Sequence, residues 1–140
     1  MIRNQLSFNI LTTESNRSSV VELVDTVLDD LLDSGKVPEM LPEHREAYRS
    51  TLMTEVRGLL ILVVSGSSGY AVAAFSLREL DHHTVGVGCV SHIMVGTCPI
   101  CTKALVRELR TFAKTRGMSW LRLQHRIGRH TYKSTLYKLR

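Results

Sequence analysis

The spacing of apolar residues predicts that the chain begins with a strand and two helices. Leu6–Thr12 alternates loosely, which is typical of a strand. Val20–Leu32 carries apolar residues at helical spacing, and Ser19-Val20-Val21-Glu22 has the pattern of a helix-capping box. A second helix is expected over Glu43–Arg57, with Gly58 ending it. The side chains that this second helix is expected to bury are Ala47, Tyr48, Leu52 and Val56.

The rest of the chain is richer in apolar and β-branched runs. Two such runs flank the turn-forming residues Ser65–Gly69 and predict a hairpin. A later apolar run leads into an amphipathic helix with Gly117 at its expected C-cap. The predicted elements are strands at Leu59–Val64, Tyr70–Leu77, Val85–Val95 and Met118–Gln124, and helices at Ile100–Arg116 and Thr131–Leu139. Together they predict one α/β domain over residues 1–140, an α+β mixed sheet with helices on both faces.

Size and composition favour a protein that folds around one core. The chain has 140 residues, 44% of them hydrophobic. No apolar run approaches the roughly 20 residues that span a bilayer, and the first residues lack the apolar segment of a secretion signal. We therefore expect a cytoplasmic protein with no membrane partner. The three cysteines are odd in number, which predicts reduced thiols rather than a disulfide framework.

Charge is distributed unevenly between the two parts of the chain. Residues 1–57 carry six Lys/Arg against ten Asp/Glu, whereas residues 58–140 carry twelve against three. From Lys103 to Arg140, eleven basic side chains accompany one acid, Glu108. This basic C-terminal face is expected to attract an acidic partner protein, a phosphorylated cofactor or the phosphates of nucleic acid. Its last part contains Arg122, His125, Arg126, Arg129, His130, Lys133, Lys138 and Arg140.

Cysteine and histidine offer two further kinds of chemistry. Cys98-Pro99-Ile100-Cys101 has the spacing of a redox pair at a helix N-terminus. With Cys89 and His92 the pair would offer four soft ligands for zinc, although residues three apart on a strand point to opposite faces. The third interpretation is that these cysteines are small core residues. Asp81-His82-His83 is interpreted as a solvated turn.

Several segments of the chain resemble the central motifs of the GCN5-related N-acetyltransferase (GNAT) family. The order of the predicted elements resembles the family as well. The matching segments are Val90–Val95, Lys103–Leu109, Phe112–Gly117, Trp120–Leu123 and Leu136–Leu139.

The resemblance implies an acetyl-CoA site between two neighbouring strands that splay apart. The pantetheine arm would pair with the backbone of Ile93, Met94 and Val95, and the pyrophosphate would lie on the N-terminus of the following helix. The residues implied at that helix N-terminus are Gly96, Thr97, Thr102 and Lys103.

The turn departs from the family pattern. Relatives carry a glycine-rich loop at this place, whereas Gly96–Lys103 has one glycine and contains Pro99, which removes an amide donor. A phosphate cradle of the usual kind is therefore not expected. Family members also continue beyond the last predicted helix, whereas this chain ends at Arg140, which implies a shortened substrate wall.

Two residues are candidates for catalysis. The resemblance implies that Tyr137 protonates a departing thiolate and that His92 acts as a general base. Each has an ordinary interpretation as a packed side chain. The altered turn favours a non-catalytic interaction or structural subunit of a larger assembly, such as a phage particle, in which case the protein belongs to the virion. The alternative is an acetyl-CoA-dependent N-acetyltransferase.

Overall fold

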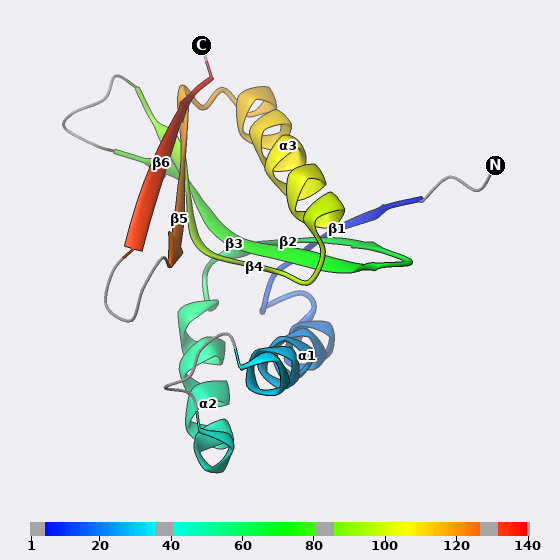
Figure 1. Cartoon of the computed structure of the whole chain (residues 1–140). Helices are drawn as coiled ribbons and strands as arrows, with labels where there is room; N and C mark the ends of the chain where they lie inside the picture. Colours follow the sequence, from blue (N-terminus) through cyan, green and yellow to red (C-terminus); the bar gives the residue numbers. More distant parts are fainter. Residues whose placement is uncertain (1–4, 36–40, 81–85, 127–131, 140) are drawn as a thin grey trace. The chain divides into compact units, whose positions relative to one another are not determined.

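The structure, a computed structural model, describes residues 5–35, 41–80, 86–126 and 132–139. The chain divides into two compact units, residues 1–10 with 61–140 and residues 11–60. The first unit holds almost all of a six-stranded mixed sheet and one helix, and the second holds two helices (Figure 1). The described residues are therefore an α+β structure, and the prediction of a single domain over residues 1–140 stays a prediction.

The sheet has the strand order β1-β2-β3-β4-β5-β6. β3 and β4 are antiparallel, β4 and β5 are parallel, and β5 and β6 are antiparallel. The parallel pair requires a crossover, which α3 supplies. The strands are β1 (Ser7–Leu11), β2 (Leu60–Gly66), β3 (Gly69–Glu79), β4 (Gly88–Gly96), β5 (Trp120–Arg126) and β6 (Tyr132–Lys138). The helices are α1 (Arg17–Ser34), α2 (Arg45–Glu55) and α3 (Pro99–Thr115), with a 3₁₀ turn, η1 (Pro42–His44).

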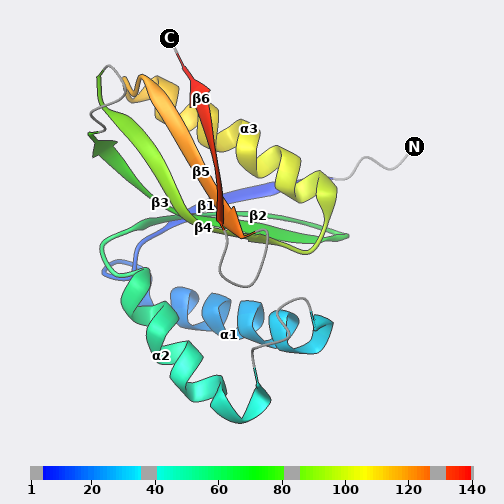
Figure 2. The same cartoon turned by 60° about the vertical axis from the view of Figure 1, so that its left-hand side comes forward.

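Helix α3 covers one face of the sheet, where it contacts β3, β4 and β5 (Figure 2). Its buried residues recur at helical spacing, and they are Cys101, Leu105, Leu109 and Ala113. Phe112 meets the buried ring of Phe75 edge to face, with the ring centroids 5.5 Å apart. Gly117 follows the helix at φ 80°, a backbone conformation that glycine adopts without strain. The amphipathic pattern thus correctly predicted this helix.

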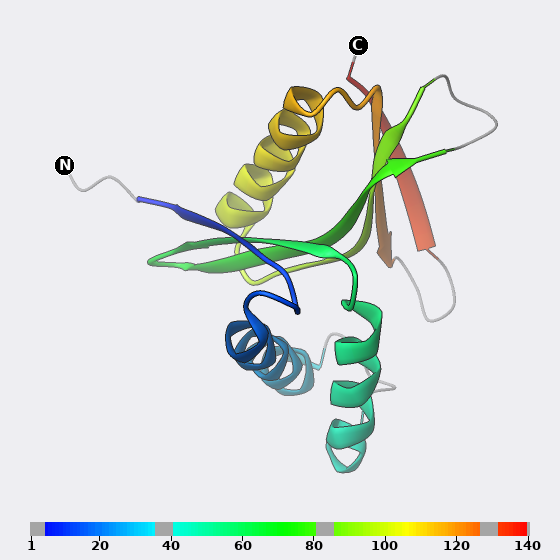
Figure 3. The same cartoon turned by 180° about the vertical axis from the view of Figure 1, so that it is seen from behind.

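Strands β4 and β5 run together only at their beginnings. Their paired residues extend from Gly88 with Trp120 to Ser91 with Leu123, and beyond these the described parts of the two strands diverge (Figures 1 and 3). The divergence begins at a β-bulge. Ala74 of β3 pairs with Ile93, and the next residue pairs with Ser91, which leaves His92 as an extra residue in β4.

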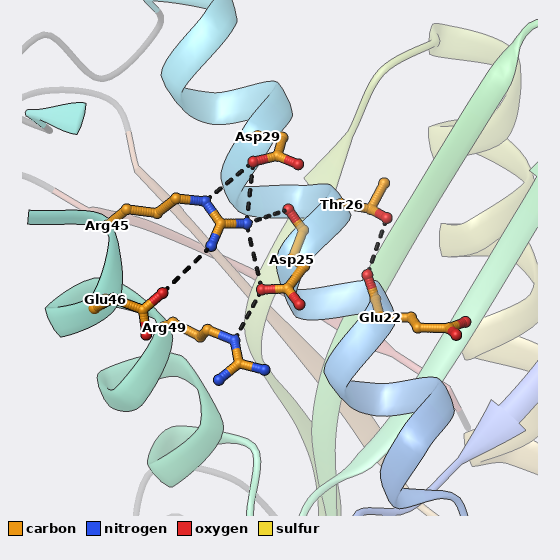
Figure 4. Close-up of polar contacts among 7 residues, drawn as sticks. All are labelled: Glu22, Asp25, Thr26, Asp29, Arg45, Glu46 and Arg49. Carbon is orange, nitrogen blue, oxygen red and sulfur yellow. Dashed lines mark hydrogen bonds and ion pairs between the residues drawn. The ribbon is translucent and has the colours of Figure 1, made fainter. Parts of the chain in front are cut away.

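The second unit is an α1–α2 helix pair joined by ion pairs (Figure 4). Arg49 Nε donates to Asp25 Oδ1 at 2.8 Å, and Arg45 lies 3.3 Å from Asp25 and 3.0 Å from Asp29. Gly35 ends α1 at φ 66°, as expected of a helix C-cap. None of the helices in the described ranges is long and apolar enough to cross a membrane.

Two details predicted for α1 and α2 are wrong. The helix begins at Arg17 with Asn16 as its N-cap, so Ser19 lies inside the first turn and makes no capping box. The Asn16 side chain is held by the loop before the helix, because its Oδ1 accepts a hydrogen bond from the amide of Thr12 at 3.2 Å. No residue within α2 is buried: Ala47 is exposed, and Tyr48 and Leu52 are half-buried. Val56 is buried as predicted, but it is the C-cap that follows the helix.

The prediction of a helix over Thr131–Leu139 is also wrong, because its described residues form β6. All seven residues of β6 pair with β5. Burial alternates along the strand, with Thr135 and Tyr137 more covered than their neighbours Leu136 and Lys138. This period of two is that of a strand, and β-branched and aromatic residues favour it. The predicted order therefore fails at its last element.

Candidate functional site

Two backbone amides at the turn between β4 and α3, those of Thr97 and Cys101, donate hydrogen bonds within the protein. The Thr97 amide donates to the Tyr70 carbonyl oxygen at 2.9 Å, and the Thr97 hydroxyl accepts from the Tyr70 amide at 3.0 Å. Cys98 is the N-cap of α3, and its Sγ accepts the amide of Cys101 at 3.3 Å. Pro99, the first residue of α3, has no N–H. The Cys98 side chain therefore lies where a helix N-terminus would otherwise bind an anion.

The stretch of β4 beyond the bulge is paired on one side. Ile93, Met94 and Val95 pair with residues of β3, and among the described residues they have no partner in β5. Within this stretch the carbonyl oxygen of Ile93 accepts the Ser91 hydroxyl at 3.4 Å. Gly96 ends the strand close to Thr102 of α3, so that a methyl group at Gly96 would press on the Thr102 hydroxyl.

The two candidates for catalysis lie on opposite faces of the sheet. The Tyr137 ring faces α3, where the Arg110 guanidinium lies 5.0 Å from its centroid. His92 is exposed, and its Nε2 lies 2.8 Å from the hydroxyl of Ser76. Ser76 follows Phe75, whose ring packs against α3, so the alternation of a strand places Ser76 and His92 on the other face. A shared acid and base role for Tyr137 and His92 therefore has no support in the geometry.

An open groove of about 670 Å³ lies between α3 and β6. Helix α3 contributes a stripe of basic side chains at the spacing of one helix face, and β6 contributes Tyr137 and Lys138. The groove is lined by Thr102, Lys103, Val106, Arg107, Arg110, Thr111, Lys114, Tyr137, Lys138 and Leu139. We call this site the basic groove.

The basic groove carries charge of one sign. Five of its lining residues are Lys or Arg, and none of the described residues that line it is Asp or Glu. Arginine presents a planar fork of N–H donors that matches a carboxylate or a phosphate, and lysine adds a mobile point charge. A concave surface lined by basic residues concentrates the field and attracts anions. The chemistry of the groove is therefore recognition of a negatively charged group.

The structure brings some of the predicted site residues together and separates others. Thr102, Lys103 and Tyr137 line the basic groove, whereas Ile93–Val95 lie on β4 and His92 lies on the far face of the sheet. The Thr102 hydroxyl also donates to the carbonyl oxygen of Cys98 at 3.1 Å.

Three lining residues, Arg107, Arg110 and Lys114, were not singled out from the sequence. Their spacing from Lys103, at four, seven and eleven residues, is the signal that could have found them. Of the basic residues near the chain end, Arg129, His130 and Arg140 lie outside the described residues.

A zinc site finds no support among the residues that the structure describes. Cys89 is fully buried and His92 is exposed, so these two side chains do not converge. The described residues contain no group of three or more His, Cys, Asp or Glu side chains placed to hold a metal ion. Asp81–His83 lies outside the described ranges.

Comparisons with protein families, with curated proteins and with solved structures find no match for this chain. The resemblance to the GNAT family therefore stays a prediction. The basic groove and the β4–α3 turn are the features from which a function can be inferred.

Proposed function

We propose that this chain is a GNAT-like domain without catalytic activity, which binds an acidic surface of a partner protein in the basic groove. The observation that carries the proposal is the lining of the groove, in which five of the described residues are Lys or Arg and none is Asp or Glu. Single ion pairs at an exposed surface contribute little, at about 0–1 kcal/mol each. A concave set of like charges acts together, and its arginines offer bidentate contacts to carboxylates.

The turn before α3 supports a role without acetyl-CoA. A pyrophosphate on a helix N-terminus needs several free backbone amides. Here Pro99 has none, the amide of Thr97 is bonded to Tyr70, and that of Cys101 is bonded to Cys98. A thiolate at Cys98 would in addition repel a phosphate. The expected loss of the phosphate cradle is thus consistent with the hydrogen bonds at the turn.

The arrangement of the catalytic candidates supports the same proposal. Tyr137 and His92 lie on opposite faces of the sheet, so one acceptor cannot reach both. The Tyr137 ring has a packing role beside Arg110, which accounts for its position without any proton transfer. An assembly such as a phage particle remains the setting that we propose for the partner, with the basic groove as the contact.

The test is a titration of the full chain with a fluorescent peptide of alternating Glu and Ser. We expect saturable binding that weakens at least about ten-fold between about 50 mM and about 300 mM salt, because the contacts are between exposed charges. The double variant Arg107→Glu and Lys114→Glu should abolish binding. The matched control is Arg17→Glu with Arg57→Glu, two exposed positions outside the groove that give the same change in net charge.

Two outcomes of this experiment would overturn the acidic protein partner. One is equal binding by both double variants, which would mean that net charge alone attracts the peptide. The other is a clear preference for single-stranded nucleic acid over the peptide, with the same dependence on Arg107 and Lys114. That result would assign the basic groove to phosphates instead.

An acetyl-CoA-dependent N-acetyltransferase is the second candidate, and one observation favours it. The strands β4 and β5 diverge after Ser91 and Leu123, which leaves one side of Ile93–Val95 unpaired for a pantetheine arm. Titration with acetyl-CoA separates the two candidates. Saturable binding at micromolar concentration that is lost in Lys103→Ala, together with transfer activity lost in Tyr137→Phe, would replace our proposal by this one.

A further inference from the structure

Cys98 and Cys101 form a close pair at the beginning of α3. Cys98 is the N-cap and Cys101 is the third helical residue, a spacing that brings two side chains to the same side of a helix. The Cys101 amide donates to Cys98 Sγ at 3.3 Å, which places the Cys98 sulfur over the first turn. Residues at this spacing lie within the Cα separation that a disulfide requires.

The two thiols have different surroundings. Cys98 is half-buried, and its Sγ lies 3.8 Å from the hydroxyl of Ser68 at the β2–β3 turn. Cys101 is fully buried, and its thiol donates to the carbonyl oxygen of Gly69 at 3.4 Å. One sulfur is therefore accessible to a reagent, and the other is held behind it within the protein.

Hydrogen bonds and burial shift the pKa values of the Cys98 and Cys101 thiols in opposite directions. The pKa of Cys98 lies below its ordinary value of 9.0, because its thiolate can accept hydrogen bonds first from the Cys101 thiol, whose one hydrogen would then turn away from Gly69, and second from the Cys101 amide. Burial, followed by the hydrogen bond to Cys98, raises the pKa of Cys101 to about 11. The positive end of the α3 dipole also favours a thiolate at its N-cap.

The local fold supplies the setting that the sequence alone did not indicate. β4 and β5 are parallel neighbours, and α3 is the crossover helix between them. The Cys-x-x-Cys segment therefore opens the helix of a βαβ unit, which is a setting associated with redox-active cysteine pairs. The position of the pair thus favours the same redox role as its hydrogen bonds and burial do.

We propose that Cys98 and Cys101 are a redox-active dithiol that reduces low-molecular-weight disulfides. The Cys98 thiolate attacks one sulfur of the disulfide, which forms a mixed disulfide and releases one thiolate. Cys101 then loses its proton and attacks the Cys98 sulfur, which closes an intramolecular disulfide and releases the second thiolate. Two protein thiols are oxidised and one disulfide is reduced, with two electrons transferred; the released thiolates take up the two protons.

Cys89 provides an internal control. It is fully buried on β4, and burial followed by the charge of Glu79 raises its pKa to about 12. A thiol in this state is unreactive at neutral pH. Any modification of Cys98 can therefore be compared with a third cysteine of the same folded chain.

The test mixes the reduced full chain with glutathione disulfide at neutral pH and follows intact mass. The wild-type chain should lose two hydrogen atoms and retain no glutathione, whereas Cys101→Ser should retain one glutathione on Cys98. Cys98→Ala should neither lose two hydrogen atoms nor retain glutathione. Cys89→Ala should behave as the wild type. In a separate alkylation assay, Cys98 should react at least about ten-fold faster than Cys89 in the folded protein.

A purely structural pair would give a different pattern. The proposal is overturned if the wild-type chain forms only disulfides between molecules, or if Cys101→Ser acquires no glutathione while circular dichroism shows it folded. If that variant fails to fold, peptide mapping of the oxidised wild-type chain decides the matter. A bond between Cys98 and Cys101 supports the proposal, and its absence at excess glutathione disulfide contradicts it.

Discussion

The guanidinium carbon of Arg110 lies 5.0 Å from the centroid of the Tyr137 ring, which joins α3 to β6 across the basic groove. This contact gives Tyr137 a role in packing and gives Arg110 a fixed position in the groove. A cation over an aromatic ring is attracted by the negative face of the ring. Arg110 therefore contributes both to the stability of the first unit and to the positive charge of the basic groove.

Arg110→Ala should lower the free energy of unfolding by about 0.5–1 kcal/mol, because the site is exposed and the attraction is partly screened. Urea unfolding followed by circular dichroism measures this change. A double-mutant cycle with Tyr137→Leu isolates the pair, and it should show a coupling of similar size. Additive effects of the two substitutions would mean that the Arg110–Tyr137 contact contributes nothing to stability.

Gly88→Ala should destabilise the sheet by about 1–3 kcal/mol, because a methyl group there overlaps the indole ring of Trp120. Trp120 is buried and is the only tryptophan of the chain, so its fluorescence reports the transition directly. The same substitution should cost much less in a Trp120→Leu background, where the ring is absent. An equal loss in both backgrounds would place the strain elsewhere.

Asp25→Asn should lower the stability of the α1–α2 helix pair at neutral pH. It should also make that stability less sensitive to acidification. The hydrogen bond from Arg49, and then those from Arg45, hold the pKa of Asp25 below its ordinary value of 3.8. A lowered pKa contributes stability above pH 3.8, and this contribution is lost as the pH falls through the lowered value.

Urea unfolding at about pH 2.5 and about pH 6 measures the difference between the wild-type chain and Asp25→Asn. The wild-type chain should lose more stability on acidification than the variant does. Asp33→Asn, an exposed position on the same helix, is the matched control and should behave as the wild type. An unchanged acid dependence in Asp25→Asn would show that the ion pairs of Asp25 with Arg45 and Arg49 (Figure 4) contribute no measurable stability.

Cys89 should make the protein labile to alkali. Its pKa is about 12 in the folded chain against an ordinary 9.0, because burial disfavours the thiolate. A raised pKa contributes stability that is fully present below pH 9.0 and is lost as the pH rises towards 12. Between about pH 9 and about pH 11 this one group should remove up to about 1.4 kcal/mol per pH unit.

The measurement for Cys89 is urea unfolding at several alkaline pH values in the wild-type chain and in Cys89→Ala. The variant leaves a small cavity and should be less stable at neutral pH, but its loss of stability with rising pH should be shallower. The difference between the two slopes is the diagnostic quantity, since other titrating groups are common to both proteins. Parallel slopes would show that Cys89 does not ionise on unfolding.

Local patterns sufficed to predict most helices and strands. The apolar positions of α1 and α3 repeat with the period of a helix, and glycines at positions 35 and 117 follow the helix ends. The hairpin of β2 and β3 has turn residues between two apolar runs. These features depend on residues close together in the chain, so periodicity and turn chemistry determine them.

The final element could not be predicted in this way. A helix was predicted over Thr131–Leu139, whereas Thr135 and Tyr137 alternate with exposed neighbours. A segment of seven residues is too short for its periodicity to decide between the two. Pairing along the whole of β5 decided in favour of the strand, because it gives hydrogen-bond partners to the facing backbone groups of both segments.

By itself the sequence determined the basic stripe of α3, the Cys-x-x-Cys pair at the start of that helix and the altered turn before it. Only the tertiary structure placed β6 beside α3 to form the groove and put His92 on the far face from Tyr137. It also brought the β2–β3 turn to the two cysteines. These contacts join residues that are distant in the chain. They form only when the strands pair and the helix packs on the sheet, so no local sequence pattern predicts them.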